Sequence, residues 1–352
     1  MKLPYPRGPV SQILLNALPR NDASDALPQL LTAAGHALAA TDDVLYDDDL
    51  QLALFCLYEL HYGGLDGVDD RWEWDVQLLQ VRALIEQQVE ARLRESVDVS
   101  APHTLTPQAV ADRLFKLAAD DDGPSVSAFL AKEATPEQAK EFVVLRSVYQ
   151  LKEADPHTWA IPRLRGRAKS AMVEIQADEY GGGKPGRIHA ELFANTMQGL
   201  GLDPSFGAYV DCIPAITLAS VNAMSLFGLQ RRLRGAICGH LAIYEMTSSI
   251  PNGKYARGFR RLGFGVEVTE YFDEHVEADA VHEQIAGRDL AGGLIAQDPA
   301  LAADVFFGAG SALYLDGLAG GWQLNAWTAG RSALRQPLDP GREVPVAVGA
   351  SA

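Results

Sequence analysis

Cysteine is scarce in this sequence, and its spacing excludes the common cysteine-based sites. Cys56, Cys212 and Cys238 are the only cysteines among 352 residues, and no two of them form a C-x-x-C pair. Redox dithiols and cysteine-rich zinc sites need clustered cysteines, and small secreted domains carry many more of them. We therefore expect three reduced, buried thiols in a cytoplasmic protein.

Long apolar runs and an excess of positive charge are also missing. No segment approaches 18 uninterrupted apolar residues, so we expect no membrane span. The first residues, MKLPYPRGPVSQ, lack the apolar region of a signal peptide. The chain has 30 Lys and Arg against 46 Asp and Glu, which gives a net charge of -16. That balance argues against a nucleic-acid partner, because phosphate neutralisation needs clustered Lys and Arg.

What the chain does contain predicts a folded, almost wholly α-helical protein. Hydrophobic residues make up 47% and charged residues 22%, as in globular proteins. We find no internal repeat and no convincing alternating strand pattern. Thr106-Pro107 and Thr135-Pro136 each place a capping residue before a proline, which is a common helix start. We expect an N-terminal arm and helical extension over 1–107, a main domain over 108–335 and a loose tail over 336–352.

One segment, EYFDEHVEADAVHE (270–283), predicts a metal site. His275, Asp279 and His282 are spaced at i, i+4 and i+7, so a helix would place all three within a narrow arc of one face. Two imidazoles and a carboxylate on one face suit iron, manganese or zinc. The simpler alternative is a solvated acidic helix with two incidental histidines. The other residues on this face of the helix are apolar, which favours metal binding.

Three more polar residues fall on stripes that we expect to face inward. Glu153 extends the stripe of Phe142, Leu145 and Tyr149, on a helix that starts at Pro136. An inward carboxylate is costly unless it is paired or bound to a metal. By contrast, we expect Lys152 to be ordinary surface charge.

The second and third inward residues flank a glycine-rich break. Glu179 shares a stripe with Met172 and Ile175, whereas Glu174 falls on another face. The break GGGKPG (181–186) follows, and His189 opens the next helix on its inner side. The glycine run does not follow a strand and lacks the order of a phosphate-binding loop, so we reject that function for it.

Together the inward residues could hold two metal ions. The predicted ligands are Glu153, Glu179, His189, His275, Asp279 and His282. Three carboxylates against two ferrous ions leave a net charge of +1, which leaves room for an anionic ligand. A zinc hydrolase more usually needs one metal with three ligands. The paired Glu-x-x-His motifs of ferritin-like di-iron proteins are not found.

The ligand order resembles that of the haem-oxygenase-like di-iron oxidases, the iron-containing redox enzymes. It is a Glu, then a Glu followed ten residues later by His, then a His-x3-Asp-x2-His helix, and it covers about residues 110–335. The resemblance implies an all-α, seven-helix, haem-oxygenase-like bundle, here with an N-terminal extension, usually forming a homodimer. It also implies two Fe(II) ions, or one iron and one manganese, with O2 as co-substrate and no haem.

Three functions remain open at this point. The resemblance favours an O2-dependent oxidase or oxygenase that acts on a small metabolite with an external reductant. Within that class we lean to N-oxygenation of an amino-acid-derived amine. The alternative reaction is oxidative desaturation or C–C cleavage of an aliphatic acid or amino acid. A helical metal-binding protein without turnover is the third possibility, and the sequence does not tell which carboxylate would bridge the metals.

Overall fold

The computed structural model describes the chain except for residues 21, 24, 98–99 and 339–352. The side chains of residues 277–281 also fall outside the description. Most of the predicted C-terminal tail, 336–352, therefore lies beyond the described part. Within that part every regular element is helical and none is a strand, so the prediction of an all-α protein is confirmed.

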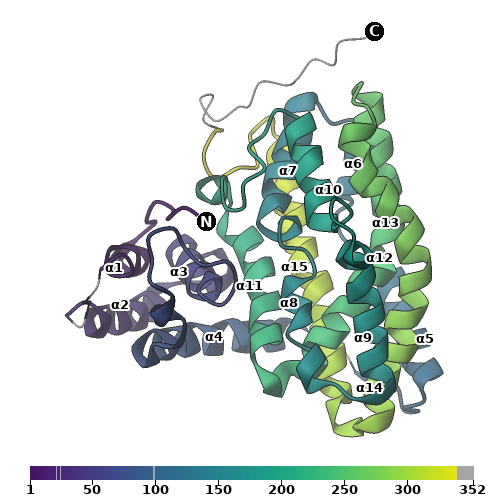
Figure 1. Cartoon of the computed structure of the whole chain (residues 1–352), viewed down its shortest axis with the longest axis horizontal. Helices are drawn as coiled ribbons and strands as arrows, with labels where there is room; N and C mark the ends of the chain where they lie inside the picture. The colour runs from purple at the N-terminus through teal and green to yellow at the C-terminus, as the bar shows by residue number, and fades with distance from the viewer. Residues whose placement is uncertain (21, 24, 98–99, 339–352) are drawn as a thin grey trace.

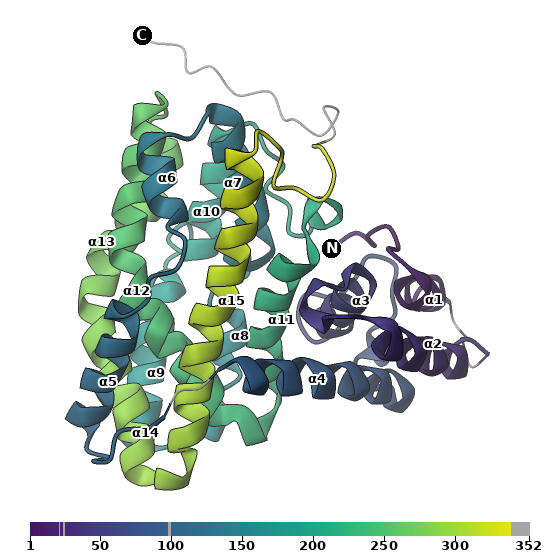
Figure 2. The ribbon, with the colours of Figure 1, turned by 180° about the vertical axis from the view of Figure 1, so that it is seen from behind.

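Two groups of helices lie side by side (Figures 1 and 2). The smaller group consists of α1 (Pro9–Ala17), α2 (Leu27–Ala40) and α3 (Asp48–Glu59), and α4 (Val76–Ser96) runs from it toward the larger bundle. The elements of the larger bundle are α5 (Pro107–Ala119), α6 (Val126–Lys132), α7 (Pro136–Gln150), α8 (Asp155–Thr158), α9 (Gly166–Glu179), α10 (His189–Gly199), α11 (Ala215–Leu229), α12 (Arg234–Arg261), α13 (Val266–Gln284), α14 (Gly292–Gln297) and α15 (Ala302–Thr328).

Helix starts follow the sequence signals. Thr106 caps α5, with its hydroxyl accepting from the amide of Ala109. Thr135 and Gln138 form a reciprocal capping box at the start of α7. Each bond satisfies an amide that the first helical turn leaves without a partner.

Helices α12 and α15 cross with their backbones almost in contact. A Cβ atom added to Gly239 would lie 1.8 Å from the Val305 carbonyl oxygen. One added to Gly308 would lie 1.9 Å from the carbonyl oxygen of Ala236. Only glycine permits this approach, because no side chain can fit at that distance. The crossing therefore fixes α12 against α15.

Helix α13 lies along the edge of the bundle that is farthest from α1–α3 in both overall views (Figures 1 and 2). Its N-terminal half packs through aromatic rings, and Phe272 stacks on Phe259 of α12 at 5.2 Å between ring centroids. Directly after α13 the chain continues as a π-helix, Ile285–Ala291. This arrangement turns one face of α13 toward the interior of the bundle.

The N-terminal helices are joined to the bundle by a buried ion pair. Lys152 follows α7 and binds Glu59 at the end of α3, and both side chains are buried. The Lys152 ammonium also lies 4.4 Å from the centre of the Tyr62 ring. Our prediction that Lys152 is a surface charge is wrong, because its partner is 93 residues away and helical phase does not reveal it.

The helical stretch Pro299–Thr328, which includes α15, is long and apolar enough to cross a membrane by length and composition alone. In this structure 61% of its most apolar window is buried inside the protein. A core helix of a helical bundle shows the same combination.

Candidate metal centre

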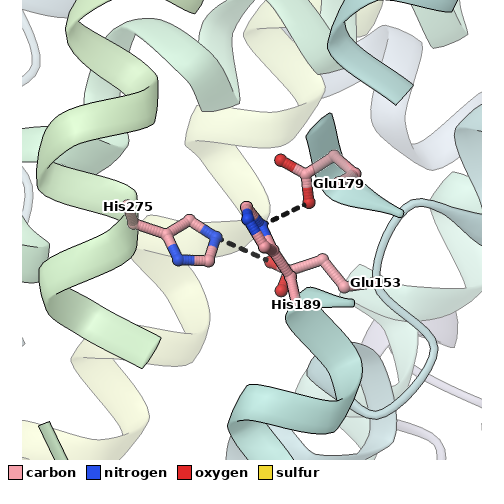
Figure 3. Close-up of side chains that lie close together, drawn as sticks. All are labelled: Glu153, Glu179, His189 and His275. Carbon is pink, nitrogen blue, oxygen red and sulfur yellow. Dashed lines mark hydrogen bonds and ion pairs between the residues drawn. The ribbon is translucent and has the colours of Figure 1, made fainter. Parts of the chain in front are cut away.

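Four polar side chains from four segments converge inside the bundle (Figure 3). Glu153 lies in the turn after α7, Glu179 ends α9, His189 begins α10 and His275 lies on α13. One possible ligand atom from each lies within 4.8 Å of those of the other three. This separation is small enough for one metal ion to contact all four.

A second group adjoins the first and shares one member with it. Glu179, Glu245 of α12 and His282 of α13 also place ligand atoms within 4.8 Å of one another. All three side chains are buried. Glu179 belongs to both groups, so its two oxygens could contact two ions.

Glu153 reaches the site by a different route from the one we predicted. Helix α7 ends at Gln150, and Glu153 belongs to the turn that follows, not to the helical stripe of Tyr149. The next residue, Ala154, has a φ of 76°, in the left-handed region that disfavours non-glycine residues. The Tyr271 hydroxyl lies 2.9 and 2.7 Å from the two Glu153 oxygens, so it can donate to either one. The turn and this bond direct the carboxylate into the site.

Glu179 and His189 form a buried pair across the glycine-rich break. Nδ1 of His189 lies 2.9 Å from Oε2 of Glu179. Burial alone would raise the pKa of Glu179, but the nearby His189, His275 and His282 outweigh it and lower the pKa to about 2. Glu179 is therefore held as a carboxylate, the form that binds metals.

The tautomer of His275 follows from its backbone partner. Its Nδ1 lies 2.8 Å from the carbonyl oxygen of Tyr271, which can only accept a hydrogen bond. Nδ1 therefore carries the proton and donates it. This leaves Nε2, which lies 3.7 Å from Oε1 of Glu153, as the atom available to a metal.

His282 lies between two carboxylates. Its Nδ1 is 3.3 Å from Glu245, and its Nε2 is 2.9 Å from Asp178, a residue with 61% of its side chain exposed. Burial lowers the pKa of His282, but Glu245 and Asp178 raise it more, to about 9. With a metal at Nδ1, the proton on Nε2 would stay bonded to Asp178. A carboxylate in that position orients a ligating imidazole and makes it more basic.

The structure brings together five of the six predicted ligands, and Asp279 is the sixth. The side chain of Asp279 lies outside the described residues. The assignment of all six as ligands stays a prediction.

Sequence reasoning missed Glu245 and Asp178. Glu245 had a usable signal, because it is a single carboxylate within the apolar stretch HLAIYEM (240–246). Asp178 had none, since its helical phase places it on a face different from that of Glu179.

The donor set fits iron. It combines carboxylates with imidazoles and contains no thiolate, which suits non-haem iron or manganese. The donors come from separate elements of the bundle, and most are buried. Closely packed buried carboxylates repel one another unless cations lie between them, so the arrangement itself favours bound metal.

A cavity of about 140 Å³ adjoins the metal donors. Roughly 10–15 Å³ on this scale suffices for one water molecule, so the cavity has room for a small metabolite. Its wall includes Glu153, Glu179, Glu245 and His275, together with the tyrosines at 149, 244, 255 and 271. The site therefore combines a candidate metal centre with space for a substrate beside it.

A buried histidine pair reaches the same cavity through His157. Nε2 of His157 lies 3.2 Å from Nδ1 of His240 on α12. Burial lowers the pKa of His157 to about 4 and that of His240 well below its usual value. Both imidazoles are therefore neutral near pH 7, in contrast to His282.

Comparison with known proteins agrees with this geometry. Over 209 residues the chain is 26% identical to a nitrosourea synthase from Streptomyces achromogenes subsp. streptozoticus. The match covers 59% of this chain and 44% of that relative, so the chain spans less than half of the relative's length. The sequence pattern of the iron-containing redox enzymes matches residues 140–317, just over half of the chain. The protein has the predicted haem-oxygenase-like all-α fold and belongs to the family of iron-containing redox enzymes.

Proposed function

We propose that this protein is an O2-dependent di-iron oxidase or oxygenase of a small metabolite, and that it oxidises a nitrogen atom of an amine. The observation that carries the proposal is the position of Glu179, which is common to two groups of possible ligands. A carboxylate shared in this way is what a bridged pair of metals requires. A single-metal site would need only one of the two groups.

Charge supports two ferrous ions rather than one. Glu153, Glu179 and Glu245 carry three negative charges, and Asp279 of the His-x3-Asp-x2-His motif is a fourth carboxylate. With Glu245 included, four carboxylates balance the four positive charges of two Fe(II) ions. One ion would balance only two of these four negative charges, and a buried carboxylate without a cation beside it is costly.

The residues of the chain would hold the metal ions and orient the side chains that bind them, and the metals would supply the redox chemistry. Two ferrous ions at this site would provide the electrons with which O2 is activated. Tyr271 orients Glu153, and the Tyr271 carbonyl group fixes the tautomer of His275. Tyr149 and Tyr244 are half-buried in the wall of the cavity beside these ligands.

The relative's name supports nitrogen as the atom oxidised. A nitrosourea contains a nitrogen–oxygen bond, so a synthase of such a compound forms or handles oxidised nitrogen. Desaturation or C–C cleavage of an aliphatic acid or amino acid is the second candidate. Few aliphatic side chains line the cavity, which disfavours a long hydrocarbon chain.

Metal analysis and oxygen uptake test the proposal together. The protein is loaded anaerobically with ferrous iron, desalted and analysed, and then mixed with O2 and a panel of amino acids and amines. We expect two irons per chain and O2 uptake that depends on one class of amine. Two irons without O2 uptake under any condition would favour a metal-binding protein without turnover. One iron or none per chain would end the di-iron proposal.

We also propose an external reductant, a homodimer, a cytoplasmic location, and neither a nucleic-acid nor a membrane partner. The net charge of -16 supports the absence of nucleic acid. A mixed iron–manganese centre stays open, because carboxylates and imidazoles bind both metals. Loading with iron and manganese together, followed by the same metal analysis, distinguishes the two compositions.

A further inference from the structure

One end of the larger bundle carries a concentration of positive charge, in a chain that is acidic overall. The segments 161–170 and 230–235 contain seven Arg and Lys residues and no Asp or Glu, whereas the whole chain has 30 basic and 46 acidic residues. We call these seven the basic end. They are Arg163, Arg165, Arg167, Lys169, Arg231, Arg232 and Arg234.

The two segments of the basic end lie beside each other. The Arg163 guanidinium donates to the carbonyl oxygen of Leu229, directly before the second segment, at 2.8 Å. Arg234 of the second segment pairs with Asp298, the residue that follows α14, at 3.0 Å. Helix α14 lies at one end of the bundle in both overall views (Figures 1 and 2). The seven cations therefore belong to one region of the surface.

Four of the seven charges have no carboxylate partner. Three of them form ion pairs with carboxylates from outside the two segments, namely Arg167 with Asp289, Arg232 with Glu90 and Arg234 with Asp298. The other four form no salt bridge within the part of the chain that the structure describes. Two of these four, Arg165 and Arg231, are exposed. The basic end therefore presents a net positive charge to solvent.

The local fold gives no reason for this charge. The first segment begins α9 and the second begins α12, and neither helix has an acidic residue in its first turn. Backbone N–H groups make the start of a helix partially positive, so Arg and Lys are unfavourable there. Residues that oppose the local fold are expected at functional positions. An acidic partner would balance the side chains and the helix starts together.

The charge pattern also narrows the kind of partner. In a two-fold dimer the same surface meets itself, so two basic ends would repel each other. Nucleic acid is disfavoured because the chain as a whole carries a net charge of -16. A small protein with one acidic patch can contact the basic end alone, and complementary charge would guide it there.

Two helices lead from the basic end to the candidate metal centre. Helix α12 starts at Arg234 and carries Glu245 eleven residues later, which is roughly 16 Å along the helix axis. Helix α9 starts in the same region and ends at Glu179, the carboxylate shared by both groups of possible ligands. The rings of His240 and Tyr244 lie on α12 before Glu245, with 4.2 Å between their centroids. A partner at the basic end is thus connected to the metal donors by continuous helix.

We propose that the basic end docks a small acidic electron-transfer protein, which supplies electrons to the metal centre. The proposal rests on the proposed function, because that function needs an external reductant. When an amine N–H becomes N–OH, one oxygen atom of O2 enters the product and the other leaves as water. Two electrons and two protons are consumed, and a one-electron carrier protein delivers the electrons in two successive encounters.

Binding of a probe protein tests the docking without any reaction. The probe is an acidic plant-type [2Fe–2S] ferredoxin, and its control is the same ferredoxin with its surface carboxylates amidated. Both are titrated by calorimetry into the metal-free and the ferrous-loaded protein. We expect the unmodified ferredoxin to bind at about 20 mM salt, at least tenfold more tightly than at about 300 mM salt and than the amidated form. A DNA duplex and vesicles of anionic lipid are titrated in parallel.

Charge reversal locates the binding site. Arg165→Glu combined with Arg231→Glu should weaken ferredoxin binding roughly tenfold to a hundredfold at low salt. Lys132→Glu combined with Arg331→Glu is the matched control, because it makes the same change in net charge at two exposed positions, at the end of α6 and after α15. Reduction of the oxidised, iron-loaded protein by ferredoxin should slow by the same factor in the first variant only. Reduction by dithionite should be unchanged, and helicity and iron content reveal a folding defect.

The outcomes separate this proposal from the proposed function. Absence of ferredoxin binding, binding that salt does not weaken, or equal losses in the two variants would overturn the docking site. Tighter binding of DNA or vesicles would overturn the choice of partner, and binding without reduction of the iron would overturn the redox role. O2 uptake that proceeds with a chemical reductant would keep the proposed function in each of these cases. Ferredoxin binding of the expected pattern, with no O2 uptake under any reductant, would keep the docking site and remove the oxidase function.

Discussion

The crossing of α12 with α15 and the attachment of α13 differ in what holds them. Gly239 and Gly308 let the first pair approach backbone to backbone, and no charge is involved. Helix α13 packs on α12 through Phe272 and adds ion pairs at its surface, such as Arg260 with Asp273. Its inner face carries His275 and His282, two of the predicted metal ligands. The α12–α15 crossing should be rigid with or without iron, whereas α13 should depend on the ion that it helps to bind.

The largest effect on stability is expected at the α12–α15 crossing. Gly239→Ala places a methyl group 1.8 Å from the Val305 carbonyl oxygen, where no side chain can move aside. We expect a loss of about 3 kcal/mol or more in the free energy of unfolding, at or above the usual range for overpacking. Urea unfolding of the metal-free protein measures it.

Gly317→Ala on α15 is the matched control. A Cβ atom there meets nothing within 4 Å, so alanine should be neutral or stabilising by up to about 1 kcal/mol. A Gly239→Ala protein that unfolds at the wild-type urea concentration would show that the crossing can open. The contrast between the two regions would then be lost.

Removing the shared carboxylate should have the largest effect on the site. Glu179→Ala takes away the group common to both clusters, and we expect loss of bound iron and of O2 uptake. Glu174→Ala is the control, because Glu174 is exposed on the other side of the same helix. Iron content after anaerobic loading shows whether Glu179 is needed for metal binding and Glu174 is not. Equal losses in the two variants would mean that general charge, not position, governs metal binding.

The buried histidine pair should make the interior beside α12 sensitive to acid. Burial lowers the pKa of His157 to about 4, so between pH 6.5 and 4 the unfolded chain binds more protons at this residue than the folded chain. Stability from neutral His157 is present above pH 6.5 and falls by on the order of 3 kcal/mol as the pH drops to 4.

Comparison with His157→Gln reports this contribution together with the change in its neighbour His240, whose pKa His157 also helps to lower. The wild type should lose stability relative to the variant across this window, measured by urea unfolding at several pH values. A difference that stays constant from pH 6.5 to 4 would contradict the assignment of His157 as a buried neutral imidazole.

A smaller effect is expected from the exposed partner of His282. Asp178→Asn keeps the shape of the side chain but weakens its hold on the Nε2 proton of His282. We expect iron affinity to fall roughly tenfold to a hundredfold, as for other carboxylates that orient a metal-bound histidine. Competition with a chelator measures the affinity, and Glu174→Gln on the same helix is the control. Unchanged affinity would show that α13 positions His282 unaided.

Local patterns predicted the helices and most of the candidate site. Caps such as Thr135 mark helix starts, and the spacing of His275 and His282 places both on the inner face of α13. The predictions failed where long-range contacts decide. Glu153 lies in a turn beyond the helix that was predicted to carry it, and the turn is completed by a bond from Gln176 to the Ala154 carbonyl group.

Buried charge was the other point at which sequence reasoning was insufficient. Lys152 is buried because Glu59, on a helix outside the main bundle, lies beside it. Asp178 contacts His282 across 104 residues from an exposed face. In both cases the partner comes from a distant part of the chain, and spacing along one helix carries no information about it.

The last prediction concerns α13 without metal. Between Leu262 and Gly287 the sequence has seven acidic residues and no Lys or Arg. Like charges at i, i+4 destabilise a helix by roughly 0.2–0.5 kcal/mol per pair. The structure shows partial relief that the sequence did not reveal, because Arg187 contacts both Glu270 and Glu274. This relief acts on the N-terminal half, where Phe272 is also packed, so that half should be stable without iron.

The C-terminal half of α13 carries His282 and ends in the π-helix that starts at Ile285. Its inner groups gain their strongest partners only when metal is present, so binding and local folding should be coupled there. Hydrogen exchange followed with and without anaerobic ferrous iron can measure this. We expect iron to raise amide protection from about residue 275 to 285, and to leave the α12–α15 crossing unchanged. High protection of that segment without iron would mean that the helix is preformed, and the two regions would then differ in their contacts but not in their stability.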